Sequence, residues 1–168
     1  GSVYSSGIRV VIAGAPNVGK STLSNRLLGT DRSIVNKTAG TTRDTISAEI
    51  TIAGAPITIV DTAGIRPTKD KTEEAGVNRA VSEIARSNLV LSVFTHNTQA
   101  VDNISDKEHL MVYNKEDEKK YRGFDKNVIA VSALKNTGIK KLFSAIEKKV
   151  NRALPYSEDT LINTERQK

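Results

Sequence analysis

Several residue types are absent or rare in this chain of 168 residues. It has no cysteine, which excludes disulfides, thiolate metal sites and a cysteine nucleophile. Neither His96 nor His109 belongs to a metal-ligand spacing pattern. No apolar run approaches the roughly 18 residues of a membrane-spanning helix, so we expect a cytoplasmic protein without a membrane partner. Aromatic residues make up only 4% of the chain, which leaves few side chains for stacking on nucleic-acid bases.

The remaining composition is that of one globular domain. The chain is 38% hydrophobic and 26% charged, and its length suits a single core. The net charge of +6 is compatible with an anionic partner. Because the basic residues are scattered along the chain, we interpret the charge mainly as a source of solubility.

Short β-rich runs alternate with amphipathic stretches, which predicts an α/β fold with a mostly parallel central sheet and helices on both faces. The pattern predicts strands over 8–13, 45–52, 56–60, 89–94, 109–113 and 128–131, and helices over 21–28, 73–86 and 139–152. The second and third strands form a hairpin, and the second is expected at the sheet edge. The connection from residue 95 to 114 is short for a crossover, so we expect one helical turn or none there.

The segment GAPNVGKS, Gly14 to Ser21, fits the pattern G-x-x-x-x-G-K-[ST] in full. It follows an expected strand and precedes an expected helix, as a phosphate-binding P-loop requires. Its backbone N–H groups can approach phosphate oxygens at the helix N-terminus. Lys20 is predicted to reach the β- and γ-phosphates and to act in catalysis, and Ser21 to offer its hydroxyl to Mg²⁺. The predicted nucleotide-binding residues of this segment are Asn17, Val18, Gly19, Lys20, Ser21 and Thr22.

Two later segments indicate which base the nucleotide carries. The carboxylate of Asp117, in the sequence NKED, can accept hydrogen bonds from guanine N1–H and N2–H₂, a pair of donors that adenine lacks. Asn114 is expected to brace the neighbouring loops, and the stem of Lys115 to lie over the purine ring. Ser132, Ala133 and Leu134 follow the last strand, where the Ala133 N–H can meet guanine O6.

Two further segments are candidates for sensing the γ-phosphate. In DTAG, residues 61–64, Asp61 is expected to hold Mg²⁺ through water, and the Gly64 N–H to report the γ-phosphate. In GTTRD, residues 40–44, Thr42 is expected to be a second Mg²⁺ hydroxyl ligand. Thr42 and Gly64 therefore join the predicted catalytic set. Both segments are predicted switches, ordered by the γ-phosphate and Mg²⁺ and released after hydrolysis.

Two residues near these motifs bear on how a bound GTP would be hydrolysed to GDP. Ile65 stands where Ras-like switches place a water-orienting glutamine. An isoleucine cannot hydrogen-bond water, so another group must orient it. Asn17 has an amide oxygen that can ligate a monovalent cation, although asparagine is also common in turns.

With these motifs in this order, the chain resembles the translation-factor-related GTPases. Residues 61–80, together with IVNKTAGTTRD, resemble the MnmE (TrmE) tRNA-modification GTPases of the TrmE-Era-EngA-like class. The resemblance implies a Ras-like G domain and a catalytic role for Glu73, which from the sequence alone is only an acid in the first turn of a helix. It also implies a K⁺ site made by Asn17, Asn36, Thr38 and Thr41.

The resemblance also implies a larger assembly. In that family the G domains form a transient, K⁺-dependent homodimer through their switches, and the full protein works with a flavoprotein partner on the wobble uridine of tRNA. We accordingly expect residues 1–6 to be a tag remnant and linker, 7–154 the G domain, and 155–168 a polar tail returning to an absent helical domain. Lys37 and the pair Thr95-His96 depart from the family's pattern.

Two alternatives stay open at this point. The first is a Der- or Era-like ribosome-assembly GTPase, because that group shares the P-loop and GTTRD. The second is a nucleotide switch that needs a partner for hydrolysis, because Ile65 replaces the glutamine.

Overall fold

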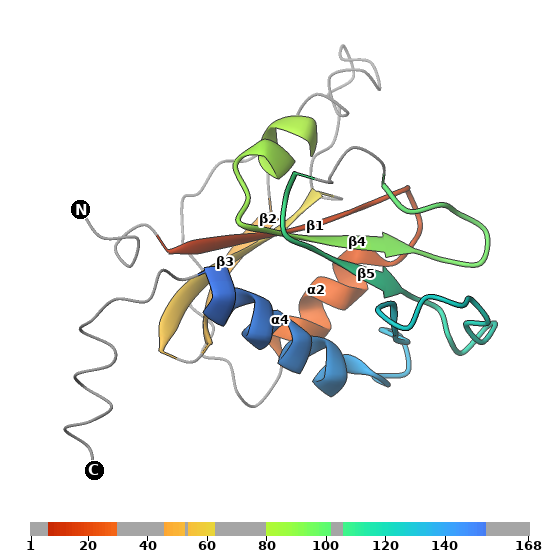
Figure 1. Cartoon of the computed structure of the whole chain (residues 1–168). Helices are drawn as coiled ribbons and strands as arrows, with labels where there is room; N and C mark the ends of the chain where they lie inside the picture. The colour runs from red at the N-terminus through yellow and green to blue at the C-terminus, as the bar shows by residue number, and fades with distance from the viewer. Residues whose placement is uncertain (1–6, 30–45, 53, 63–79, 102–105, 154–168) are drawn as a thin grey trace.

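The computed structural model describes residues 7–29, 46–52, 54–62, 80–101 and 106–153. In this part of the chain one sheet of six strands forms the centre of the molecule, in the order β2-β3-β1-β4-β5-β6 (Figure 1). Strand β2 is antiparallel to β3, and the other neighbours are parallel. The strands are β1 Ile8–Gly14, β2 Ile46–Ile52, β3 Ala55–Asp61, β4 Leu89–Phe94, β5 His109–Tyr113 and β6 Ile129–Ala130. The predicted α/β fold with a mostly parallel sheet is confirmed.

The central strands lie where the apolar runs predicted them. Strands β1 and β4 consist mostly of β-branched and aliphatic residues, and most of their side chains are buried, as expected inside a parallel sheet. Strand β2 is at the edge of the sheet, and its alternate residues Ala48, Ile50 and Ile52 are buried. The predicted edge strand and hairpin are therefore confirmed.

The last strand is shorter than the sequence predicted. Residues 128–131 were expected to be extended, but β6 contains only Ile129 and Ala130. The N–H of Val128 donates to the carbonyl of Asp125 at 3.3 Å and closes a turn before the strand. After it, Ser132 and Thr137 exchange main-chain hydrogen bonds and turn the chain away from the sheet.

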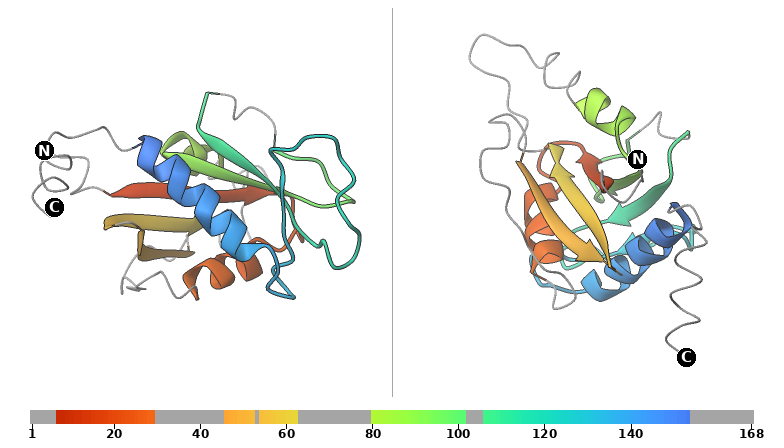
Figure 2. Two further views of the ribbon diagram at one scale, coloured as in Figure 1. Left: turned by 60° about the horizontal axis from the view of Figure 1, so that its bottom comes forward. Right: turned by 90° about the vertical axis from the view of Figure 1, so that its left-hand side faces the viewer.

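Helices cover both faces of the sheet. Helix α2 (Lys20–Leu28) and helix α4 (Ile139–Ala153) lie together on one side, and the helical residues 80–85 lie on the other (Figures 1 and 2). The predicted apolar stripe of α4 is part of the main core and consists of Ile139, Leu142, Phe143, Ile146 and Val150. The predicted helix over 73–86 is described only from residue 80, and its first part lies outside the described residues.

The chain after β4 covers part of the second face without a helix in residues 95–101 and 106–108, the described part of the 95–114 connection. Val101 packs with Ile84 against buried Ala13 and Val90. The Val101 N–H also donates to the Ser92 hydroxyl at 3.1 Å. In these described residues, turns and irregular backbone stand where a crossover helix would otherwise lie. None of the helices in the described ranges is long and apolar enough to cross a membrane.

Candidate nucleotide-binding site

The predicted P-loop connects β1 to α2 at the end of the sheet where the parallel strands finish (Figure 1). Two of its residues must be glycine because of close neighbours. A Cβ on Gly14 would lie 2.4 Å from the carbonyl oxygen of Val93 in β4. Gly19 has a φ of +92°, and its Cβ would lie 2.4 Å from Nδ2 of Asn114. The loop therefore packs tightly against β4 and the loop that follows β5.

Lys20 folds back over the P-loop. Its ammonium donates to the carbonyl oxygens of Gly14 at 2.5 Å and of Ala15 at 3.0 Å. The side chain is buried, and this desolvation lowers the pKa of Lys20, while the negative charge of Asp61 acts in the opposite direction. A buried cation that donates to two carbonyl oxygens is electrostatically suited to accept a phosphate anion.

Ser21 and Asp61 are in contact at the start of α2 and the end of β3. The Ser21 hydroxyl donates to Oδ2 of Asp61 at 2.7 Å, and Asp61 is 1% exposed. Hydroxyl and carboxylate oxygens are the donor types that Mg²⁺ takes in phosphate sites, so this pair fits the predicted metal. The next residue, Thr62, is fixed by donating to the Ile12 carbonyl at 2.7 Å.

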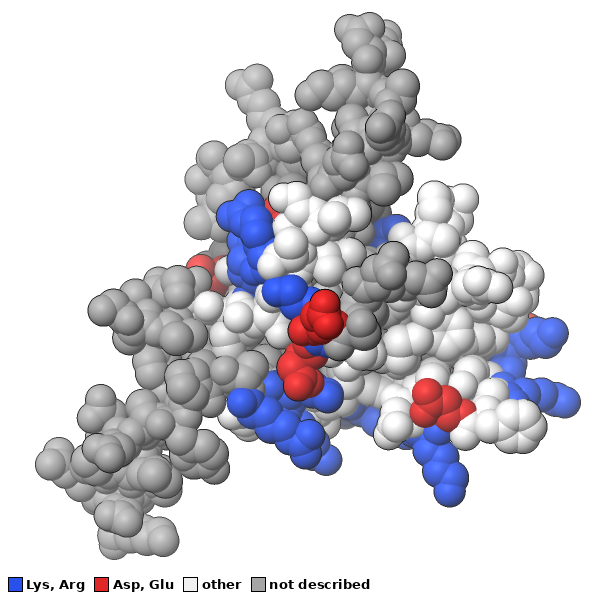
Figure 3. Space-filling view, turned by 45° about the horizontal axis from the view of Figure 1, so that its top comes forward, with Lys and Arg blue, Asp and Glu red and all other residues white. Residues whose placement is uncertain are grey.

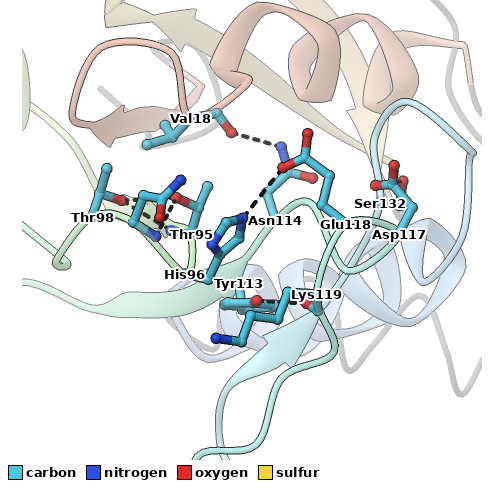
Figure 4. Close-up of polar contacts among 11 residues, drawn as sticks. Val18, Thr95, His96, Thr98, Tyr113, Asn114, Asp117, Glu118, Lys119 and Ser132 are labelled. Carbon is cyan, nitrogen blue, oxygen red and sulfur yellow. Dashed lines mark hydrogen bonds and ion pairs between the residues drawn. The ribbon is translucent and has the colours of Figure 1, made fainter.

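Asn114 connects three segments of the predicted site (Figure 4). Its side-chain amide donates to the carbonyl of Val18 in the P-loop at 2.7 Å. Its Oδ1 accepts from the N–H of Ala133 at 3.0 Å. Asn114 is 3% exposed, so both contacts are shielded from water. The bracing role predicted for this side chain is thus visible in its geometry.

Asp117 is held at one carboxylate oxygen by the loop after β6. The Ser132 hydroxyl donates to Oδ1 of Asp117 at 2.7 Å and accepts from the N–H of Lys135 at 3.0 Å (Figure 4). Asp117 remains exposed, whereas Ser132 is buried. The carboxylate is therefore oriented while still open to a ligand. The neighbouring Lys115 has a φ of +66°, so the chain turns sharply there.

Three aromatic rings support the loop that carries Asp117. Phe94, Tyr113 and Tyr121 pack edge to face or tilted, with ring centroids 5.1–6.3 Å apart. The Tyr113 hydroxyl donates to the Lys119 carbonyl at 2.6 Å. Burial raises the pKa of Tyr113, and the charges of Glu116 and Glu118 raise it further. The short connection after β4 also contacts the loop that carries Asp117, because His96 Nε2 lies 3.3 Å from a carboxylate oxygen of Glu118 (Figure 4).

Other predicted residues fall in two groups. Asn17 and Thr22 are exposed on the P-loop and the first turn of α2, and Asn17 has a φ of +68°. The remaining candidates lie outside the described residues and stay predictions: Asn36, Thr38, Thr41, Thr42, Gly64 and Glu73.

Arg26 is a contact of the site that the sequence analysis missed. Its Nε donates to the Ala133 carbonyl at 2.7 Å, and its Nη2 donates to the Leu134 carbonyl at 3.0 Å. Arg26 lies in the last turn of α2, where a basic residue is ordinary. Its partners are 107 and 108 residues away, so no local sequence pattern marks the contact.

The basic side chains do not form one patch on the face drawn in Figure 3. Among the described residues they lie in several separate groups, with acidic side chains between some of them (Figure 3). Lys149 and Glu108 form an ion pair with 2.9 Å between Nζ and Oε2, and this contact lowers the pKa of Glu108. This face supports the interpretation of the net charge as spread over the surface.

Comparison with known proteins agrees with the class that the fold and these loops define. A family described as 50S ribosome-binding GTPase matches residues 9–133. Since this match covers most of the chain, the chain belongs to this family of P-loop GTPases, which hydrolyse GTP.

Particular relatives within that class are the tRNA modification GTPases named MnmE. The protein from Thermotoga petrophila is 40% identical over 185 aligned residues, which cover 100% of this chain and 41% of that protein. The protein from Aquifex aeolicus is 39% identical, with 97% of this chain and 39% of that protein covered. The resemblance to the MnmE G domain is therefore confirmed, and the chain spans about two fifths of these relatives.

Solved structures show the same fold. Era from Aquifex aeolicus, a Y63A variant bound to GDP·AlF₄⁻, has a TM-score of 0.60 and 28% identity, covering 89% of this chain and 57% of that one. The G domain of FeoB from Methanococcus jannaschii has a TM-score of 0.61 at 23% identity, covering 86% of this chain and 98% of that one. The predicted Ras-like G-domain fold is confirmed.

Proposed function

We propose that this chain is the GTP-binding and GTP-hydrolysing domain of a cytoplasmic GTPase that acts in the modification of the wobble uridine of tRNA. Relatives up to 41% identical are named tRNA modification GTPases, which supports the tRNA assignment. The observation that carries the guanine-nucleotide part is Asn114, because it joins the P-loop to the two loops predicted to contact the base.

The phosphates of GTP bind the P-loop in this proposal. The N–H groups of residues 17–22 point at the phosphate oxygens, and the Lys20 ammonium contacts the β- and γ-phosphates. Lys20 already lies across the loop on the carbonyls of Gly14 and Ala15, so little movement is needed. Ser21 and Thr42 would hold Mg²⁺ through their hydroxyls and Asp61 through water, and that ion would supply positive charge at the phosphates.

The base binds between Lys115 and the two loops after β5 and β6. Asp117 accepts hydrogen bonds from guanine N1–H and N2–H₂, with its other oxygen fixed by Ser132. The Ala133 N–H, which donates to Asn114 Oδ1 at 3.0 Å, also meets guanine O6. The exposed Leu134 completes the edge of this pocket.

Hydrolysis proceeds by in-line attack of water on the γ-phosphorus. The bond between the γ-phosphorus and the bridging oxygen breaks, and GDP and phosphate leave. Glu73 orients the attacking water in place of the glutamine that Ile65 replaces, and Gly64 and Thr42 contact the γ-phosphate region. Asn17, Asn36, Thr38 and Thr41 would hold K⁺, which would supply the positive charge that an arginine finger supplies elsewhere.

The proposed partners follow from this mechanism. Two copies of the domain form a transient homodimer through the switch segments. In the longer protein, a flavoprotein partner and tRNA take part in the modification. The name of the relatives, tRNA modification GTPase, supports the tRNA part, and this chain matches about two fifths of their length.

Steady-state GTP hydrolysis tests the proposal. Turnover is measured with Mg²⁺ in matched KCl and NaCl over a range of protein concentrations. We expect K⁺ to accelerate turnover relative to Na⁺, and more strongly at high protein concentration. Equal slow rates in the two salts would contradict the K⁺ and dimer parts, and would favour a switch that needs a partner for hydrolysis. Absence of GTP turnover and of GDP binding would contradict the proposal altogether.

A further inference from the structure

Arg26 contacts the base-side loop from a helix that begins at the phosphate side of the site. Helix α2 starts at Lys20, so its first turn carries the groups proposed to bind phosphate and Mg²⁺. Arg26 is six residues further along this helix, or about 9 Å at the helical rise. One rigid element therefore connects the phosphate side to the loop of residues 132–134 proposed to contact guanine.

The two hydrogen bonds of Arg26 have a defined geometric effect. Nε and Nη2 belong to one planar guanidinium group, and they donate to the consecutive carbonyls of Ala133 and Leu134. A planar fork that binds two consecutive carbonyls fixes the dihedral angles between them. The carbonyl of Ala133 is thus held by Arg26, while its N–H is held by Asn114.

We propose that Arg26 is a positioning residue for guanine recognition, which acts by holding Ala133 so that its N–H is shared between Oδ1 of Asn114 and O6 of the base. This inference rests on the proposed function, because it needs guanine to bind at residues 132–134. Arg26 itself does not contact the nucleotide. Without it, two carbonyls lose a charged donor, and the backbone around Ala133 can rotate.

The test separates recognition of O6 from the general stability of the domain. Dissociation constants are measured for GDP and for the diphosphate of 2-aminopurine riboside, which lacks the O6 oxygen and the N1–H but keeps the 2-amino group. The proteins are the unsubstituted 168-residue chain, Arg26→Ala, Arg26→Lys and the control Arg152→Ala. Arg152 is a matched control because it is an exposed arginine in the last turn of the other long helix, α4.

We expect Arg26→Ala to weaken GDP binding about tenfold. The same change should alter binding of the 2-aminopurine nucleotide less than about twofold, because this ligand offers no O6 to the Ala133 N–H. The GDP affinity of Arg26→Lys should lie between those of the unsubstituted chain and Arg26→Ala, since one ammonium cannot reproduce the two-pronged contact of a guanidinium. In GTP hydrolysis, Arg26→Ala should raise KM and leave kcat unchanged, and Arg152→Ala should match the unsubstituted chain.

Two results would overturn the role of Arg26 and leave the proposed guanine site standing. One is an unchanged GDP affinity in Arg26→Ala. The other is an equal loss for both nucleotides, which would indicate a purely structural contact. If the unsubstituted chain binds GDP no better than the 2-aminopurine nucleotide, the proposed guanine site fails and the inference fails with it. Thermal unfolding of each variant confirms that the compared proteins are folded. If Arg26→Ala is unfolded, Arg26→Lys is compared with the unsubstituted chain instead.

Discussion

The side-chain amide of Asn114 donates a 2.7 Å hydrogen bond to the main-chain carbonyl of Val18, so the loop after β5 is tied to the P-loop. These residues are 96 positions apart in the sequence, and both are buried. The contact makes the phosphate side and the base side of the site one connected unit. A nucleotide that binds both sides would therefore meet a site whose geometry is already set.

Replacing Asn114 should weaken both the fold and nucleotide binding. In Asn114→Ala the Val18 carbonyl and the Ala133 N–H each lose the hydrogen bond to this side chain in a buried region. An unsatisfied buried group costs about 1–3 kcal/mol, so we expect a loss of that order in the free energy of unfolding. Urea unfolding and GDP titration measure the two effects. Asn127→Ala, at an exposed asparagine, is the control, and equal stability of the two variants would contradict the bracing role.

Gly19 and Gly54 form a matched pair for testing the close approach of the P-loop to Asn114. Both have positive φ, +92° and +82°, so an alanine at either position pays a backbone cost of about 1–2 kcal/mol. Only at Gly19 does the added Cβ meet a neighbour, Nδ2 of Asn114 at 2.4 Å, whereas the space at Gly54 is open.

We therefore expect Gly19→Ala to lose about 1–3 kcal/mol more folding free energy than Gly54→Ala, because Asn114 must leave the Val18 carbonyl. Gly19→Ala should also weaken GDP binding, and Gly54→Ala should not. Chemical denaturation and calorimetric titration give both quantities. If the two variants are equally stable and bind GDP equally, Asn114 moves aside without cost and the contact is dispensable.

The central fold was predictable because its signals are local. The apolar runs of β4 and β5 predicted strands over the same residues that the structure shows, since a buried parallel strand needs a continuous apolar stretch. The glycines and the lysine of the P-loop were predictable because the motif fixes their spacing.

The sequence was less informative where contacts between distant residues determine the local structure. Strand β6 is two residues shorter than predicted because the turn bonds of Val128 and Ser132 limit it. The Arg26 contacts escaped notice because they join residues more than 100 positions apart. The contact between Ser132 and Asp117 is similar, since both residues were candidates but nothing in the sequence paired their side chains.

Removal of the Ser21 hydroxyl should reduce the affinity for Mg²⁺. In the proposed site the Ser21 hydroxyl contacts that ion and Asp61 holds it through water, and Oγ of Ser21 lies 2.7 Å from Oδ2 of Asp61. Loss of one group that holds or orients a metal typically costs about 10–100-fold in metal affinity. In Ser21→Ala we expect the Mg²⁺ concentration for half-maximal GTP hydrolysis to rise about tenfold or more. Ser144→Ala in α4 is the control, and an unchanged Mg²⁺ dependence in Ser21→Ala would exclude Ser21 as a ligand.

Substitution of Asp117 by asparagine should move the preference from guanine toward xanthine. The Ser132 hydroxyl donates to Oδ1 of Asp117, and in the variant it can donate to the amide oxygen in the same way. The amide nitrogen then faces the base, where it can donate to O2 of xanthine but cannot accept from the guanine N1–H and N2–H₂ groups. We expect GTP affinity to fall about tenfold or more and XTP affinity to rise, measured by competition against a fluorescent nucleotide. The control is Asp125→Asn, at an exposed acid further along the same loop between β5 and β6. It should change neither affinity. Unchanged GTP affinity in Asp117→Asn would mean that this carboxylate does not contact the base, and the guanine pocket would have to lie elsewhere.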